Sequence, residues 1–211
     1  MLPPSPKEQP FTSAPVTLEG EHVTLEPLSL DHLPELARIA FEPSIWLWTQ
    51  KRVTNPAELR AFVESALAEA ADGKALPWAT RSKADGRLAG STRFMDIVPA
   101  HRTLEIGGTW LNPAFHRSGI NVEAKYLQLT HAFQVMGARR VSFKTHHQNL
   151  KSQTAIRALG ASEEGVFRNH MIHSDGTARH SMWFSIVAEE WAAVKSHLDA
   201  RLAAYAGSRR P

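Results

Sequence analysis

Residues 104–121 read LEIGGTWLNPAFHRSGIN, and this stretch decides the fold. A strand-like run from Leu104 to Leu111 leads into a polar loop that contains Gly119. Behind the loop, apolar residues recur at spacings of four and three from Val122 onward, which predicts an amphipathic helix that ends at Gly137. The expected order is therefore strand, glycine-containing loop and helix.

A loop of this kind suits a phosphate group. The first N–H groups of a helix have no partner within the helix and lie at the positive end of its dipole. Gly119 lets an anion come close to the backbone, and Arg117 adds a positive charge. Many strand-to-helix connections contain one glycine and one arginine, so the loop alone does not distinguish a phosphate site from an ordinary connection.

The rest of the chain also mixes strands and helices. Alternating apolar residues indicate strands, and Ser29, Asn55 and Gly160 stand where helix caps are expected. The expected strands cover residues 21–27, 76–83, 87–95, 103–111, 140–145, 165–173 and 181–187. The expected helices cover residues 30–40, 56–71, 122–136, 150–159 and 189–206, with an aromatic loop at 44–48 and a hairpin turn at Asp175-Gly176.

Length and composition favour one domain. A chain of 211 residues with 43% hydrophobic residues can bury one substantial core. We expect this domain to span residues 16–206, after a disordered, proline-rich lead-in (1–15) and before a loose tail (207–211). Cysteine is absent, so disulfides and thiolate metal sites are excluded, and the cytosol is the default location.

Charge and histidine content invite two other interpretations. The net charge of +3 is not gathered into one block, which disfavours nucleic-acid binding and fits an acidic ligand such as a CoA phosphate. No apolar run is long enough to span a membrane. Eleven histidines suggest a metal site, but adjacent strand residues such as His146 and His147 point to opposite faces, so we expect none.

A second motif follows the next strand, with the sequence NLKSQTAIRALGA at residues 149–161. Together with the glycine loop, it resembles the GNAT superfamily of N-acetyltransferases, in which a Gln/Arg-x-x-Gly-x-Gly/Ala loop opens a helix and an Asn-containing helix comes later. The Glu-Ile-Gly strand, the Leu-Asn-Pro step and Glu189-Glu190-Trp191 are similar to the RimJ/RimL-type branch. The resemblance covers roughly residues 16–191.

The resemblance implies an α+β fold of three layers, α/β/α. Its central sheet is mixed, mostly antiparallel, with six to seven strands, and helices flank it. It also implies acetyl-CoA as cosubstrate. The residues expected to contact acetyl-CoA are Leu111, through its backbone N–H, and His116, Arg117, Ser118, Gly119, Ile120, Asn121 and Asn149; Lys125, Arg139 and Lys151 are candidates for its 3′-phosphate. The alternative role of Asn149 is that of a helix cap alone.

The sequence departs from the family pattern at three positions. His116 stands where Gln or Arg is usual, and Asn121 replaces the final Gly or Ala, where it could cap the helix or crowd the phosphate. Ile156 takes the place of a tyrosine that protonates the departing thiolate in many members. Tyrosine catalysis is therefore excluded at that position.

In the implied mechanism an amine attacks the acetyl thioester directly. Glu105 is the expected base, with a strand-end salt bridge as its alternative, and Ser152 is the expected donor to the thiolate or cofactor. Trp48 either lines the acceptor pocket or packs between helices, and Arg93 either binds an acidic acceptor or forms a salt bridge.

The acceptor itself is left open, as a protein N-terminus or a small-molecule amine, and so is a homodimer. A non-catalytic acyl-CoA-binding or regulatory module is the alternative to an enzyme.

Overall fold

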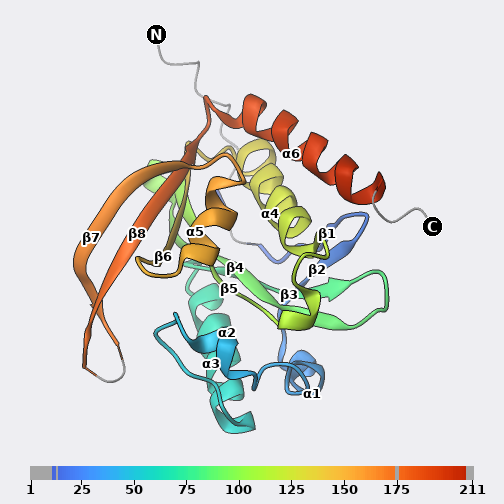
Figure 1. The fold of residues 1–211 in the computed structure, drawn as a ribbon, viewed down its shortest axis with the longest axis vertical. Coiled ribbons are helices and arrows are strands. Elements are labelled where there is room, and N and C mark those ends of the chain that lie inside the picture. Colours follow the sequence, from blue (N-terminus) through green and yellow to red (C-terminus); the bar gives the residue numbers. More distant parts are fainter. Residues whose placement is uncertain (1–10, 13, 174–175, 208–211) are drawn as a thin grey trace.

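One mixed sheet of eight strands runs through the protein (Figure 1). The computed structural model describes residues 11–12, 14–173 and 176–207. The strand order is β1-β2-β3-β4-β5-β6-β8-β7, and among these strands only β5 and β6 pair in parallel. The strands are β1 (Leu18–Glu19), β2 (Val23–Pro27), β3 (Leu76–Ser82), β4 (Leu88–Val98), β5 (Thr103–Leu111), β6 (Arg140–His146), β7 (Ser162–Ile172) and β8 (Ala178–Val187).

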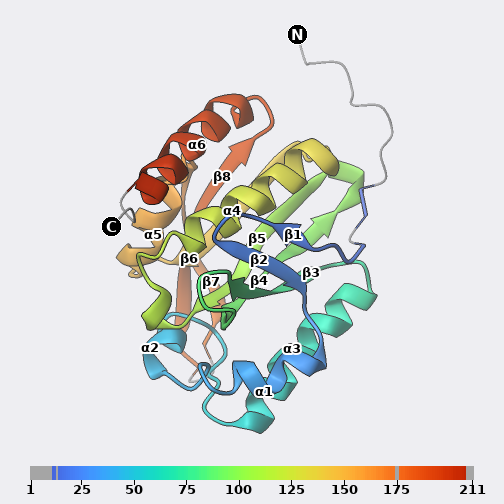
Figure 2. The same cartoon turned by 90° about the vertical axis from the view of Figure 1, so that its right-hand side faces the viewer.

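Helices cover both faces of this sheet (Figures 1 and 2). One hydrophobic core lies between the sheet and α4 (Ile120–Thr130), α5 (Leu150–Arg157) and α6 (Trp191–Gly207). A second core lies under α1 (Leu33–Leu36), α2 (Pro43–Trp46) and α3 (Pro56–Ala71). Neighbouring residues of β3 serve opposite cores, Trp78 the first and Ala79 the second, as the alternation of a strand requires. The predicted three-layer α+β fold is confirmed, with the short β1 as an additional strand.

Several predicted boundaries shift for local reasons. The helix expected at 30–40 is a 3-10 turn, η1 (Leu30–His32), followed by the four-residue α1, and Pro43 holds Glu42 in an extended conformation that ends the helical run. Residues 44–46 of the expected aromatic loop belong instead to α2. The remaining short elements are η2 (Pro99–His101), η3 (Pro113–Phe115) and a π-helical turn, η4 (His131–Val135), that extends α4.

The start of β2 is set by a buried carboxylate on α4. Glu123 is only 5% exposed and accepts hydrogen bonds from the backbone N–H groups of Glu21, His22 and Val23, at 2.8, 2.7 and 2.7 Å. Gly20 is required beside it, because a Cβ there would lie 2.4 Å from Glu123 Oε2. Glu123 therefore pins the β1–β2 connection to α4, and β2 begins two residues later than the predicted strand.

The two chain ends lie mostly outside the described residues. Only residues 11, 12, 14 and 15 of the expected lead-in are described, and of the expected tail only Gly207, which ends α6. Asp175 of the predicted hairpin turn also lies outside, while Gly176 has the positive φ of 83° that a tight turn requires. Within the described ranges, no helix is long and apolar enough to cross a membrane.

Candidate active site

The parallel strands β5 and β6 separate in the middle of the sheet. They pair over Thr103–Arg140, Leu104–Val141 and Glu105–Ser142, and no pairing between these two strands follows. Asn112 N–H donates to Ala89 of β4, so the preceding N–H, that of Leu111, points away from β4 and into the opening. We call this opening the split. The expected contact between the Leu111 N–H and acetyl-CoA stays a prediction, and this direction of the N–H is compatible with it.

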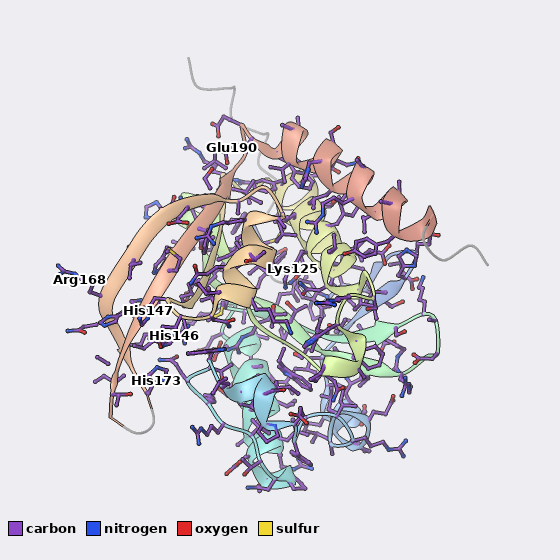
Figure 3. All side chains as sticks on the ribbon, viewed as in Figure 1. Lys125, His146, His147, Arg168, His173 and Glu190 are labelled. Carbon is purple, nitrogen blue, oxygen red and sulfur yellow. The ribbon has the colours of Figure 1, made fainter. Side chains whose placement is uncertain are left out.

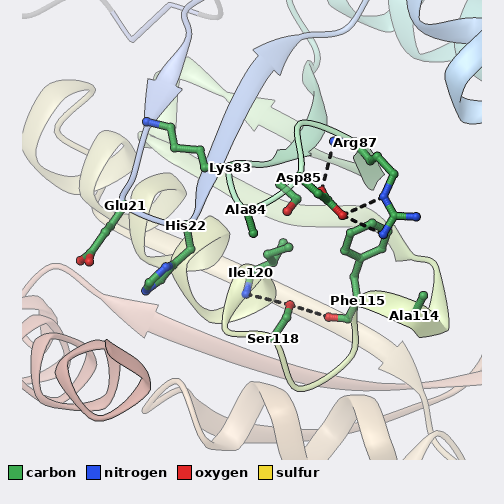
Figure 4. Close-up of a pocket in the computed structure, with 11 residues that line it drawn as sticks. Glu21, His22, Lys83, Ala84, Asp85, Arg87, Ala114, Phe115, Ser118 and Ile120 are labelled. Carbon is green, nitrogen blue, oxygen red and sulfur yellow. Dashed lines mark hydrogen bonds and ion pairs between the residues drawn. The ribbon is translucent and has the colours of Figure 1, made fainter. Parts of the chain in front are cut away.

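The glycine loop joins this split to α4 (Figure 4). Gly119 is the residue that caps α4, with a φ of +85° and no side-chain cap bond, so the suggestion that Asn121 caps the helix is wrong. The first helical bond runs from Glu123 N–H to Gly119 C=O, which leaves the N–H groups of Ile120, Asn121 and Val122 without acceptors inside the helix. A pyrophosphate is an anion that such groups can bind.

Side chains shape both ends of this loop. Ser118 Oγ donates to Phe115 C=O and accepts from Ile120 N–H at 3.4 Å, so it holds the turn (Figure 4). His116 Nδ1 lies 2.9 Å from Lys151 Nζ at the start of α5. Burial and the Lys151 charge lower the pKa of His116, which keeps the imidazole neutral at pH 7. Arg117 is exposed and has a φ of +61°. Arg117 and Lys151 are therefore the two cations at this loop that a bound phosphate could contact.

The second motif packs against the same opening. Asn149 is the N-cap of α5, and its Oδ1 accepts from Ser152 N–H at 3.1 Å. This capping role was one of the two alternatives for Asn149. Ser152 is half-buried, and its hydroxyl has no hydrogen-bond partner in the described part of the chain. Ile156 points into the first core at 8% exposure, so its side chain supplies no acid.

Glu105 lies at the base of the split, where β5 and β6 part. Its side chain is almost completely buried, and Glu105 Oε2 accepts from Lys144 Nζ at 2.7 Å. Burial raises the pKa of Glu105 to about 7, although the Lys144 charge opposes the rise. The two interpretations of Glu105, a base and a salt-bridge partner, are therefore compatible. The carboxyl group pairs with Lys144, and with a pKa of about 7 it can exchange a proton near neutral pH.

Trp48 and His146 border a pocket of about 160 Å³ at the end of β6. Their ring centroids are 4.9 Å apart, and the remaining lining residues come from the segment after α2 and from the β7–β8 hairpin. Burial, together with the charges of neighbouring histidines and Arg179, lowers the pKa of His146 to about 4. The pocket thus has an aromatic wall that stays uncharged at pH 7.

Several histidines gather at this pocket (Figure 3). The centroid of the His146 ring is 4.6 Å from that of His147 and 5.5 Å from that of His173. The prediction that His146 and His147 point to opposite faces is wrong, because β6 ends at His146 and His147 belongs to the following turn. Among the described residues, no group of three potential ligands is placed to hold a metal ion.

Arg93 does not enter this pocket as a free cation. Its Nη1 lies 3.1 Å from Glu69 Oε2 on α3, and its side chain passes over Gly108. The salt-bridge alternative for Arg93 is the one that the structure contains. Lys144, Arg179 and Trp183 were not among the predicted site residues, although they lie on the same face of the sheet as Glu105. Lys144 is the only one of the three in β6, and Arg179 and Trp183 lie four positions apart in β8, a spacing that carried no chemical signature.

Lys125 points into the protein rather than toward the position expected for a 3′-phosphate. Its Nζ donates to Thr92 Oγ1 at 2.7 Å, Thr109 Oγ1 at 2.7 Å and Gln128 Oε1 at 2.9 Å. None of these partners carries a charge. Burial therefore lowers the pKa of Lys125 to about 7.

The lowered pKa of Lys125 predicts that the free energy of unfolding rises with pH in the alkaline range. Between the folded pKa of about 7 and the unfolded value the unfolded chain binds the extra proton, so stability rises with pH. We expect the free energy of unfolding to be larger by about 2 kcal/mol at pH 10 than at pH 8. Urea unfolding of Lys125→Met should remove this gain, whereas Lys74→Met, at an exposed ion pair, should retain it. An equal gain in Lys125→Met would contradict the prediction.

Comparison of the sequence and the fold with known proteins identifies relatives of this chain. The model of the acetyltransferase (GNAT) domain matches residues 22–162. A solved structure from T. thermophilus, provisionally designated an acetyltransferase, is 40% identical with a TM-score of 0.81, covering 89% of this chain and 97% of that one. A GCN5-related N-acetyltransferase from Brucella melitensis is 31% identical with a TM-score of 0.82, covering 93% and 87%.

A curated relative gives a shorter match. The chain is 25% identical over 114 residues to the uncharacterized N-acetyltransferase YoaA of Bacillus subtilis, and the match covers 54% of this chain. It spans 63% of the length of that relative. The family model nevertheless covers about two thirds of this chain, and the two solved structures share its fold. The chain belongs to the GNAT family of acetyltransferases.

Proposed function

We propose that the protein is an acetyl-CoA-dependent N-acetyltransferase that acts on a primary amine. The observation that carries the proposal is the position of Glu105. It is a buried carboxylate with a pKa of about 7 at the base of the split, and the anion-binding start of α4 follows the same strand. A base and a phosphate loop are thus joined by one continuous segment, residues 105–120.

Each residue then has a defined task. The loop N–H groups and Lys151 bind the pyrophosphate, and acetyl-CoA supplies a thioester whose carbonyl carbon is electrophilic. Leu111 N–H donates to the thioester oxygen. Glu105 accepts a proton from the acceptor ammonium, directly or through one water, so that the neutral amine can attack the thioester carbon. The C–N bond forms as the C–S bond breaks, and the second proton of the nitrogen passes to the departing thiolate. Ile156 is apolar and supplies no acid to the departing sulfur. None is required, because a thiol with a pKa near 8.5 is a tolerable leaving group.

Three short sequence motifs also favour one branch of the GNAT family. The Glu-Ile-Gly strand, the Leu-Asn-Pro step and Glu189-Glu190-Trp191 favour the RimJ/RimL-like branch, and we keep the cytosol as the default location of a chain without cysteine. The acceptor is then a protein N-terminus or a small-molecule amine. A non-catalytic acyl-CoA-binding module is the second candidate, because Asn121 and Ile156 both depart from the family pattern.

Calorimetric titration with acetyl-CoA tests the proposal. We expect saturable binding that survives high salt and weakens about tenfold in Gly119→Ala, because a Cβ at a φ of +85° costs about 1–2 kcal/mol and moves the N–H groups of the loop. Gly176→Ala is the matched control: its φ is +83°, and open space surrounds it. No binding to the wild-type protein would refute the proposal. Binding without turnover on any amine would favour the non-catalytic module.

A further inference from the structure

Arg179 of β8 is a buried cation that pairs with no carboxylate of the residues that the structure describes. The residue is only 8% exposed, and its Nε atom has no hydrogen-bond partner. The two other arginine and lysine side chains on this part of the sheet are neutralised, Lys144 by Glu105 and Arg93 by Glu69. Within the described ranges, Arg179 forms neither an ion pair nor a hydrogen bond through its guanidinium. A buried and uncompensated charge of this kind destabilises a folded protein unless a ligand completes it.

The side chain of Arg179 lies on the acceptor side of the split. Along β8, Arg179, Ser181 and Trp183 alternate onto one face of the sheet. The Trp183 ring lies 5.3 Å from Lys144 Nζ, which in turn contacts Glu105, so this face is the one that carries the proposed base. Arg179 acts on the same groups electrostatically, since its charge lowers the pKa of both Glu105 and His146.

A second unsatisfied donor accompanies Arg179. The indole Nε1 of Trp183 is buried and has no hydrogen-bond partner. Buried polar groups in folded proteins are nearly always paired, and these two groups can only donate. What they lack is therefore a hydrogen-bond acceptor, and for the guanidinium an anionic one. Arg179 acts electrostatically on His146, which lines the pocket together with Trp48 and stays uncharged at pH 7, so this wall does not supply the missing negative charge.

We propose that the acceptor amine carries a carboxylate, and that Arg179 binds this carboxylate while the amine faces Glu105. The inference rests on the proposed function and narrows its substrate class. Guanidinium and carboxylate are both planar and can form two parallel hydrogen bonds, which fixes orientation as well as affinity. The carboxylate belongs either to a free amino acid or to an acidic residue near a peptide N-terminus, since both present the same group to Arg179.

Matched acceptors test the preference. The kcat/KM for acetyl transfer is measured on free amino acids against their α-amides, and on dipeptides ending in aspartate amide against asparagine amide. We expect the wild-type protein to favour the carboxylate in one of the two series by at least about 100-fold, because the uncharged analogue leaves the arginine unpaired. Arg179→Gln should reduce that ratio to about 1. The series that shows the preference identifies the source of the carboxylate.

The control removes the same charge elsewhere on the hairpin. Arg168 on β7 is exposed and points away from the labelled histidines (Figure 3). Arg168→Gln should keep the full preference. Equal rates on acid and amide in the wild-type protein would overturn the inference, and so would a preference that survives in Arg179→Gln. An equal loss on acid and amide would instead make Arg179 a positioning residue for Glu105.

Thermal unfolding gives a readout that does not need turnover. Sodium acetate, compared with sodium chloride at equal ionic strength, should raise the midpoint of the wild-type protein by about 2–4 °C at saturating concentration and leave Arg179→Met unchanged. Without acetate, Arg179→Met should melt above the wild type, whereas Arg168→Met should not. No acetate effect on the wild type would overturn the inference. Loss of acetyl-CoA binding in calorimetry would refute the proposed function separately.

Discussion

Replacing Glu105 by glutamine should lower kcat/KM for acetyl transfer by about 10²- to 10⁴-fold, the range contributed by a positioned general base. The substitution keeps the shape of the side chain and removes its ability to accept the proton of the amine. Binding of acetyl-CoA should change little, because Glu105 lies at the base of the split and not in the loop at 116–121. Parallel kinetics and calorimetry measure the two effects.

The pH profile adds a sharper test of the same residue. In the proposed mechanism Glu105 accepts a proton in its ionised form, and its pKa is about 7, so kcat/KM of the wild type should fall as the pH drops below about 7. The charged groups that act on this pKa are Lys144 and Arg179, which lower it, and Asp96, which raises it. In Glu105→Gln the acidic limb should be absent. Persistence of the same limb in that variant would assign the base to another residue.

Asp96 provides the matched control for this experiment. Its carboxylate lies 3.3 Å from the same Lys144 Nζ but is 61% exposed. Asp96→Asn removes one negative charge beside Lys144 without touching the split, so we expect less than about a threefold change in kcat/KM. The midpoint of the acidic limb should move slightly downward, since Asp96 raises the pKa of Glu105.

Replacing Glu123 by glutamine should reduce the free energy of unfolding by about 3–5 kcal/mol. The carboxylate accepts from three successive backbone N–H groups, and a carboxamide offers one oxygen and turns an N–H donor toward the others. The donors left unpaired cannot all reach water, because Val23 is fully buried. Chemical denaturation followed by circular dichroism measures the loss.

A surface carboxylate at the end of β1 provides the control substitution. Glu19 pairs with Lys83 at 2.6 Å, yet its side chain is 64% exposed. Glu19→Gln should change the free energy of unfolding by less than about 1 kcal/mol, as exposed ion pairs contribute little. If Glu123→Gln were as mild as Glu19→Gln, the three short hydrogen bonds would not anchor the β1–β2 connection.

Neither stability effect concerns the chemistry of the site, and together they separate two uses of buried charge on α4. Glu123 is fully satisfied by backbone donors, so its removal should destabilise the protein. Lys125 is held by uncharged acceptors only, and its folded pKa of about 7 records the cost of keeping it charged in the interior. The two residues lie two positions apart in the sequence, and we expect the lysine to make the free energy of unfolding rise with pH above pH 8.

The sequence by itself determined the parts of the protein that depend on neighbouring residues. The glycine loop, the start of the following helix and the Asn149 cap follow from backbone requirements that a few adjacent residues satisfy. The alternation of strands fixed the layers of the fold. Where local rules failed, as for Asn121 and for the helix expected at 30–40, the competing influence was also local: Gly119 in the first case and Pro43 in the second.

Only the tertiary structure decided which charged residues gather on the face of the sheet that carries Glu105. Glu105, Lys144 and Arg179 come from three strands, and β6 joins them because it lies between β5 and β8 in the sheet. Whether a strand residue is neutralised depends on the elements packed beside it: Arg93 pairs with Glu69 of α3, and in the described part of the chain Arg179 pairs with no carboxylate. Such pairings join residues tens of positions apart, and no spacing within one strand encodes them.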